Sequence, residues 1–78
     1  PNPFNPTTSI RFSVPESAPV SLEVFDALGR RIEVLVDRTM DAGWHSISWN
    51  ASDLASGMYF YRLVVGTHAL NKSMILMR

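Results

Sequence analysis

The chain of 78 residues has no cysteine, and this absence removes several kinds of chemistry at once. Without thiols there is no disulfide, no thiolate zinc site and no cysteine nucleophile. No apolar run approaches the roughly 18 residues of a transmembrane segment. No sign of charge dominates, because seven basic residues balance seven acidic ones. We therefore expect no nucleic-acid partner and no transmembrane segment, and little charge repulsion to oppose self-association.

The chain also lacks an apolar stripe at helical spacing, and shows instead short segments in which apolar and polar residues alternate. These segments are residues 7–14, 20–26, 31–36, 44–50, 58–65 and 69–77. The turns between them are too short for a helical crossover, so neighbouring strands are antiparallel. Hydrophobic residues make up 46% of the chain, which is enough for one core. The sequence predicts an all-β fold, an immunoglobulin-like antiparallel β-sandwich of about seven short strands.

The segment that begins at residue 31 departs from simple alternation. Ile32, Val34 and Val36 alternate with polar residues and are predicted to face the core. Leu35 interrupts this pattern, which predicts a β-bulge or a strand buried on both faces. Residues 37–44 are expected to leave the sheet as an excursion over the surface.

The sequence contains few groups with which to build an active site. His45 shares a strand face with Trp49 by parity and is predicted to be half-buried and structural, whereas His68 follows a turn and is predicted to be solvated. Two histidines without cysteine do not complete a tetrahedral zinc site. No serine lies in a nucleophile elbow, and a sandwich this small has little room for a pocket that excludes water. We expect no enzyme activity and no cofactor.

Several carboxylates fall in predicted turns, where such side chains usually cap their own backbone. These residues are Asp26, Asp37, Asp41 and Asp53, with Asn50 beside the last of them. Sandwich loops can also gather the six to eight oxygens that calcium needs, and residues 50–53 are the best local candidate.

The aromatic residues allow a second interpretation, a carbohydrate platform. Alternation along the strands divides them between faces, however. Trp49, Tyr59 and Tyr61 are predicted to pack inward, whereas Trp44 and Phe60 are predicted to be exposed. We therefore favour core packing for most of the aromatic area.

Five motifs occur in order along the whole chain. They read "PNPFNPTTSIRF", "DALGR", "AGWHSISW", "LASGMYFYRL" and "KSMIL". Together they resemble the C-terminal sorting domain of the bacterial type IX secretion system, in its type A form. The residues before the last strand that match this family are Pro1, Asn2, Pro3, Phe4, Pro6, Gly29, Arg30, Gly43, Gly57 and Tyr59.

The resemblance implies a single domain over residues 1–78 that acts as a sorting signal and has no catalytic role. In Bacteroidota-type bacteria such a domain directs an exported cargo protein through the outer membrane. The implied partners are the outer-membrane translocon with its shuttle proteins, and a sortase that removes the domain as the cargo is anchored to the cell surface or released. The implied route starts from a signal peptide upstream of Pro1, passes through the periplasm and ends at the cell surface or outside.

The first and last segments have predicted roles of their own. Residues 1–6 are a proline-rich leader that favours an extended chain and resists β-pairing, and residues 7–78 form the sandwich. In the last strand, the residues that match the part of the family most tied to export are Lys72, Met74, Ile75 and Leu76. We predict that they bind the translocon, because a terminal edge strand can accept a partner strand. The same edge predicts a homodimer or a strand swap.

Two alternative functions are compatible with the composition. The first is a carbohydrate-binding or adhesive module at the end of a secreted glycoside hydrolase or similar enzyme, which requires exposed coplanar aromatic rings. The second is a structural immunoglobulin-like spacer, which predicts that the final strand tolerates mutation.

Overall fold

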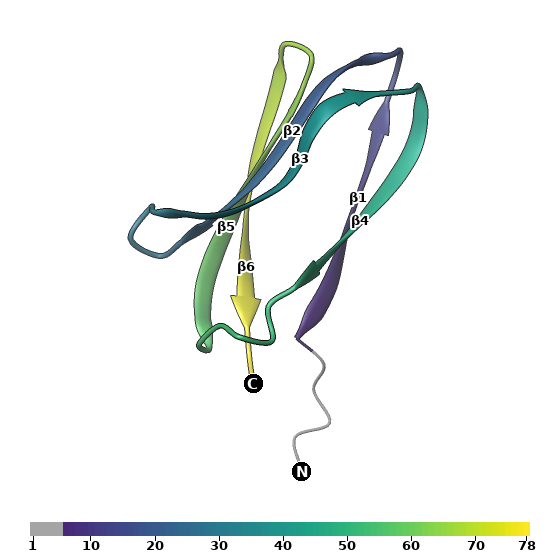
Figure 1. Cartoon of the computed structure of the whole chain (residues 1–78). Coiled ribbons are helices and arrows are strands. Elements are labelled where there is room, and N and C mark those ends of the chain that lie inside the picture. Colours follow the sequence, from purple (N-terminus) through teal and green to yellow (C-terminus); the bar gives the residue numbers. More distant parts are fainter. Residues whose placement is uncertain (1–5) are drawn as a thin grey trace.

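The computed structural model describes residues 6–78, and these residues form six β-strands (Figure 1). The strands are β1 (Thr7–Val14), β2 (Ala18–Asp26), β3 (Arg31–Met40), β4 (Gly43–Asn50), β5 (Gly57–Val65) and β6 (His68–Leu76). The predicted all-β sandwich is confirmed, with six strands in the described part of the chain where about seven were expected. Residues 6–78 contain no helix long and apolar enough to cross a membrane.

The strands form two antiparallel sheets of unequal width. One sheet is the pair β1–β4, and the other has the order β3-β2-β5-β6. The pair β1–β4 faces the wider sheet, and β1 begins at the same end of the molecule at which β6 ends (Figure 1). Because two strands face four, the wider sheet has strands at its margins that the smaller sheet covers only in part.

The core lies between the sheets and consists of two adjoining clusters. The larger cluster contains Ile10, Phe12, Val14, Val20, Leu22, Val36, Met40 and Leu63. The smaller cluster contains Val24, Trp49, Ala51, Tyr59 and Leu76. Leu22 and Val24 of the central strand β2 are 0% exposed, and burial of each such side chain stabilises the fold by about 1.5 to 3 kcal/mol. The inward faces of β1, β2 and β5 follow the alternation in the sequence.

Strand β3 contains a bulge at Leu35. Leu22 of β2 lies opposite Val36. The next residue of β2, Glu23, lies opposite Val34, which leaves Leu35 without a partner on β2. The sequence-based prediction of a bulge at this position is confirmed.

The prediction that Ile32 and Val34 face the core is wrong. Val36 is buried, but Val34 is 45% exposed and Ile32 is 37% exposed. The bulge adds one residue to β3, so the alternation is reversed on its N-terminal side and Val34 points outward. Glu33 is then the residue that points inward, and it lies opposite the buried Val24.

The expected surface excursion after residue 36 is also wrong. Strand β3 continues to Met40, which lies opposite Ala18 and is 4% exposed. Only Asp41 and Ala42 connect β3 to β4. The polar residues of this segment face solvent on a paired strand, and this pairing with β2 is not visible in the local sequence.

Candidate functional site

Strand β6 lies at one edge of the four-stranded sheet. It pairs with β5 on one side, and no strand of residues 6–78 pairs with its other side. The two strands are joined by Gly66 and Thr67, with Gly66 at a φ of 59° and Thr67 at a negative φ. This combination fits a two-residue type II′ hairpin turn. The Gly66 amide donates a 2.9 Å hydrogen bond to the Pro19 carbonyl oxygen, which fixes the turn to β2.

The hairpin determines which backbone groups of β6 remain available. In a two-residue hairpin the flanking residues, here Val65 and His68, form a hydrogen-bonded pair. Along β6 the backbone groups then point alternately toward β5 and away from it. Those that point toward the free edge belong to Ala69, Asn71, Ser73 and Ile75. This edge is a template for an added strand.

The four predicted translocon-binding residues do not share one surface. Leu76 is 6% exposed and belongs to the smaller core cluster, and Met74 is half-buried beside it. Ile75 points to the outer face of the sheet and is 68% exposed. Lys72 is exposed on the inner face, opposite Tyr61 of β5. Lys72 and Ile75 are therefore accessible to a partner, whereas Leu76 holds β6 against the core.

The residue that follows β6 by two positions is anchored to a distant loop. The Arg78 amide donates a 3.0 Å hydrogen bond to Ser56 Oγ. Its guanidinium Nη1 donates to the carbonyl oxygens of Ser52 and Leu54, the latter at 2.7 Å. These bonds tie the end of β6 to the connection between β4 and β5. Sequence reasoning missed this role, because no local pattern pairs a terminal arginine with that connection.

The "DALGR" motif builds the turn between β2 and β3. Asp26 Oδ1 accepts the amides of Leu28 (2.9 Å) and Arg30 (3.0 Å), and Oδ2 accepts Arg30 Nε at 2.7 Å. Gly29 adopts a φ of 84° and donates its amide to the Asp26 carbonyl oxygen at 3.0 Å. The hydrogen bond from the Arg30 amide is the main cause that lowers the pKa of Asp26. The prediction that Asp26 caps its own backbone is confirmed, and Gly29 and Arg30 shape a turn.

Other motif residues also lie at structural positions. The Tyr59 ring is buried and meets Trp49 edge-on at 5.6 Å, and its hydroxyl donates to the Ala55 carbonyl oxygen at 2.7 Å. Gly43 and Gly57 are the first residues of β4 and β5. The contacts of Tyr59 give that residue a structural role, and the two glycines mark the starts of strands.

Most of the predicted leader falls outside the described residues. This applies to Pro1, Asn2, Pro3 and Phe4. Pro6 is described, and its carbonyl oxygen accepts the Ala51 amide at 3.3 Å. This bond joins the start of β1 to the end of β4.

The two histidines lie in different surroundings. His45 is half-buried, its Nε2 is hydrogen-bonded to the Asp41 carbonyl oxygen at 2.8 Å, and its ring lies 5.8 Å from that of Phe12. His68 is exposed. The predictions that His45 is half-buried and structural and that His68 is exposed to solvent are both confirmed.

The candidate calcium loop at residues 50–53 has a local explanation. Asn50 Oδ1 accepts the Ser52 amide at 2.9 Å, which caps the turn after β4. In the described part of the chain, no group of three or more His, Cys, Asp or Glu side chains is placed to hold a metal ion.

Among residues 6–78, the exposed aromatic residues do not form a platform. Trp44 is 64% exposed on the outer face of β1–β4, and the Arg11 guanidinium carbon lies 4.3 Å from its ring centroid. Phe60 is 36% exposed on the outer face of the other sheet. Trp49 and Tyr59 are buried and Tyr61 is half-buried, as predicted. The two exposed rings lie on opposite outer faces, so they cannot bind one flat sugar chain together.

Comparison with known families gives one match that covers almost the whole chain. Residues 1–77 match the family model described as "Secretion system C-terminal sorting domain". No curated protein and no solved structure matches the chain. The matched range contains all six strands and every motif residue named above.

Proposed function

The chain belongs to the family of secretion system C-terminal sorting domains, and we propose that the free edge of β6 is the surface that the type IX translocon binds. The domain is a C-terminal sorting signal for type IX secretion, and the protein that carries it ends at the cell surface or outside the cell. The members of this family are sorting signals and not enzymes.

The observation that carries the proposal is the edge of β6 that no strand of residues 6–78 pairs with, on a strand of nine residues. An added strand gains affinity from main-chain hydrogen bonds along such an edge and specificity from side chains at alternate positions. Asn71 and Ser73 direct backbone groups toward this edge, and Ile75 adds an exposed apolar side chain on the outer face. The edge therefore has the length and chemistry for strand addition.

Binding at the edge of β6 is one step in a sequence of events. The cargo reaches the periplasm by way of a signal peptide, shuttle proteins and the translocon engage the folded domain, and a sortase removes the domain as the cargo is anchored or released. The leader over residues 1–6 separates the cargo from the sandwich over residues 7–78. Family membership supports this order.

A second copy of the chain is a competing occupant of the same edge. An antiparallel pairing that uses all of β6 is centred on Lys72 and places the two lysines opposite each other. Like charges directly opposite destabilise a strand pair, and an edge lysine is a common device against edge-to-edge association. We therefore rank the translocon above the homodimer as the partner of β6.

A reporter fusion tests the proposal. The chain is placed behind a signal peptide and a fluorescent protein in a bacterium with a type IX system, and in a matched strain without the translocon. Ser73→Pro removes an amide at the free edge and leaves the bonds to β5 in place. Ser73→Val is the matched control, because it keeps the amide and the outward side chain.

We expect surface or medium fluorescence that depends on the translocon for the unchanged chain and for Ser73→Val, and a loss of most of it for Ser73→Pro. Circular dichroism checks that the proline variant is folded. Equal export of a folded Ser73→Pro variant would show that the free edge is not read. Deletion of residues 74–78 is less informative, because it also removes the buried Leu76 and the anchor of Arg78.

A further inference from the structure

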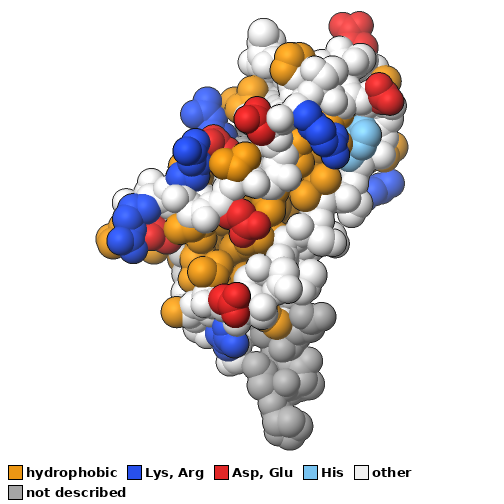
Figure 2. Space-filling view, viewed as in Figure 1, with side chains coloured by type: hydrophobic (Ala, Val, Ile, Leu, Met, Phe, Trp, Pro, Cys, Tyr) orange, Lys and Arg blue, Asp and Glu red, His pale blue; other side chains and the backbone are white. Residues whose placement is uncertain are grey.

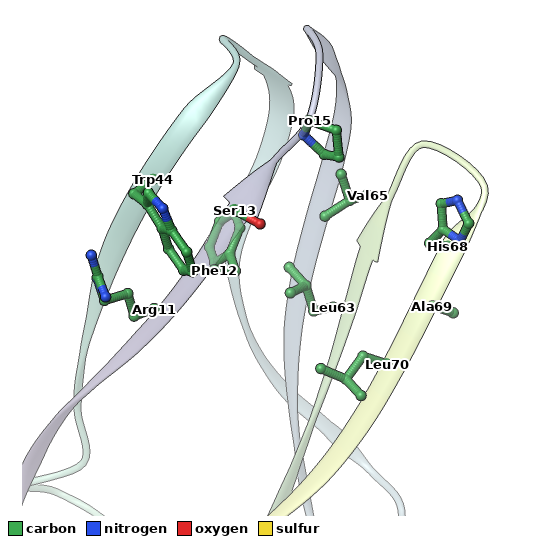
Figure 3. Close-up of a pocket in the computed structure, with 10 residues that line it drawn as sticks. All are labelled: Arg11, Phe12, Ser13, Pro15, Trp44, Leu63, Val65, His68, Ala69 and Leu70. Atoms are coloured by element: carbon green, nitrogen blue, oxygen red, sulfur yellow. The ribbon is translucent and has the colours of Figure 1, made fainter.

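Two hollows lie between the edges of β1 and β6, and together they are called the groove below. At one end a hollow of about 380 Å³ is lined by Phe12 of β1, Leu63 of β5 and Leu70 of β6, which point into it (Figure 3). At the other end a hollow of about 200 Å³ is lined by Thr8 of β1 and Met74 of β6. Both hollows border the same edge of β6. The smaller sheet therefore leaves the inner face of β6 partly uncovered along its length.

The inner face of β6 carries an alternating set of side chains. Leu70 lies opposite the buried Leu63, and Lys72 lies opposite the half-buried Tyr61. Met74 completes the series two residues further on. Leu70 is 46% exposed although its partner Leu63 is 6% exposed. An added strand beside β6 would bury Leu70 and Met74 and would bring one of its own side chains next to Lys72.

Lys72 has no counter-charge within ion-pair distance among residues 6–78. It makes no ion pair or hydrogen bond in the described structure, where the two ion pairs lie on β2, β3 and their turn. The charges are also divided along the chain. All seven acidic residues lie between Glu16 and Asp53, and β1, β4, β5 and β6 contain none. Figure 2 shows acidic side chains mixed with basic ones over β3 and its neighbouring turns. Lys72 is the one Lys, Arg, Asp or Glu residue of β6 and lies between Leu70 and Met74 on its inner face, so this stretch of the edge favours a negatively charged side chain.

We propose that the segment added to the free edge of β6 is an extended strand of the translocon with an apolar–acidic–apolar series on the face that meets the groove. The acidic side chain lies beside Lys72, and the apolar side chains lie beside Leu70 and Met74. Period-two alternation places these three side chains on one face of the strand. This inference rests on the proposed function, because it names the chemistry of the partner at the same edge. A second copy of the chain does not fit, since its own β6 carries a lysine at the centre and no acidic residue.

Two synthetic peptides of nine residues test the inference on the isolated folded chain. Both alternate valine and threonine. One has glutamate at the central position of the valine face, and the other has lysine there. Each is titrated to millimolar concentration into the isotope-labelled chain, and amide chemical shifts are followed by NMR. We expect the glutamate peptide to bind about tenfold more tightly and to shift the amides of Asn71 and Ser73.

A charge reversal makes the test specific. Lys72→Glu is expected to invert the preference, so that the lysine peptide binds more tightly. Arg38→Glu is the matched control, because Arg38 is an exposed cation on β3, the opposite edge strand of the same sheet, and it should leave the preference unchanged. Raised salt should reduce the difference between the peptides.

Three results would overturn the inference: equal affinity of the two peptides, shifts confined to β3, or no binding of either peptide. Each is distinguishable from failure of the proposed function. If the peptides show no charge preference while Ser73→Pro still abolishes export, the edge is read but the charge pattern is wrong. If export does not depend on the edge at all, the proposed function fails first.

Discussion

The indole nitrogen of Trp49 donates a 3.0 Å hydrogen bond to Oε1 of Glu33, and this bond joins β4 of the smaller sheet to β3 of the larger one. Trp49 is 2% exposed, so its N–H needs a partner inside the fold. The bulge at Leu35 supplies that partner, because it turns Glu33 inward. The bulge in β3 thus provides the hydrogen-bond acceptor for Trp49, the largest buried side chain of the core.

Substitution of Glu33 tests this relationship. Glu33→Ala leaves the indole N–H without an acceptor and should lower the free energy of unfolding by about 1 to 3 kcal/mol. Glu33→Gln keeps an acceptor oxygen and should lower it by less. Urea unfolding followed by tryptophan fluorescence measures both values. Equal losses in the two variants would show that the hydrogen bond itself does not matter.

The lowered pKa of Asp26 predicts a pH dependence of stability. Because the folded-state pKa lies below the ordinary aspartate value of about 3.9, the ionised carboxylate stabilises the turn fully above that value. This contribution is lost as the pH falls through the folded-state pKa. Asp26→Ala should therefore lower the melting temperature at pH 7, and the difference from the unchanged chain should shrink below about pH 4. A difference that stays constant from pH 7 to pH 3 would contradict this.

Truncation of two adjacent residues of β6 should affect different properties, the stability of the domain in one case and its export in the other. Leu76→Ala removes a side chain from the core and should cost about 2 to 5 kcal/mol of unfolding free energy. Ile75→Ala changes an exposed side chain and should cost no more than about 0.5 kcal/mol, while it reduces export of the reporter fusion. Chemical unfolding and the export assay measure the two effects separately. Normal export of Ile75→Ala would remove Ile75 from the binding surface.

The charge of Lys72 should keep the domain monomeric. Lys72→Val removes the like-charge contact at the centre of a β6–β6 pair and extends the apolar inner face. This variant should dimerise at concentrations at which the unchanged chain sediments as a monomer. Analytical ultracentrifugation measures both. A dimer of the unchanged chain with β6 at its interface would instead show that Lys72 does not protect this edge.

Local sequence determined most of the strands and turns of this domain. Alternation placed Ile10, Phe12 and Val14 on one face, and it separated the inward Tyr59 from the exposed Phe60. The hydrogen bonds of Asp26 could be anticipated because an aspartate before a glycine turn caps its own backbone. Periodicity and turn chemistry act over a few residues, so they can be read without knowledge of the fold. The motifs that define the family are readable in the same way.

Tertiary structure alone decided how those strands are paired and which side chains share a surface. A single unpaired residue, Leu35, reversed the faces of Val34 and Glu33, and pairing with β2 turned the segment up to Met40 into a strand. The terminal motif reads as one unit in sequence, yet the fold buries Leu76 and leaves Lys72 at an open edge beside a groove. Register, bulges and sheet width depend on contacts between residues that are distant in the chain. No pattern within one strand carries that information, and for this reason the sequence predicted that the last segment is an edge strand but not which of its side chains are exposed.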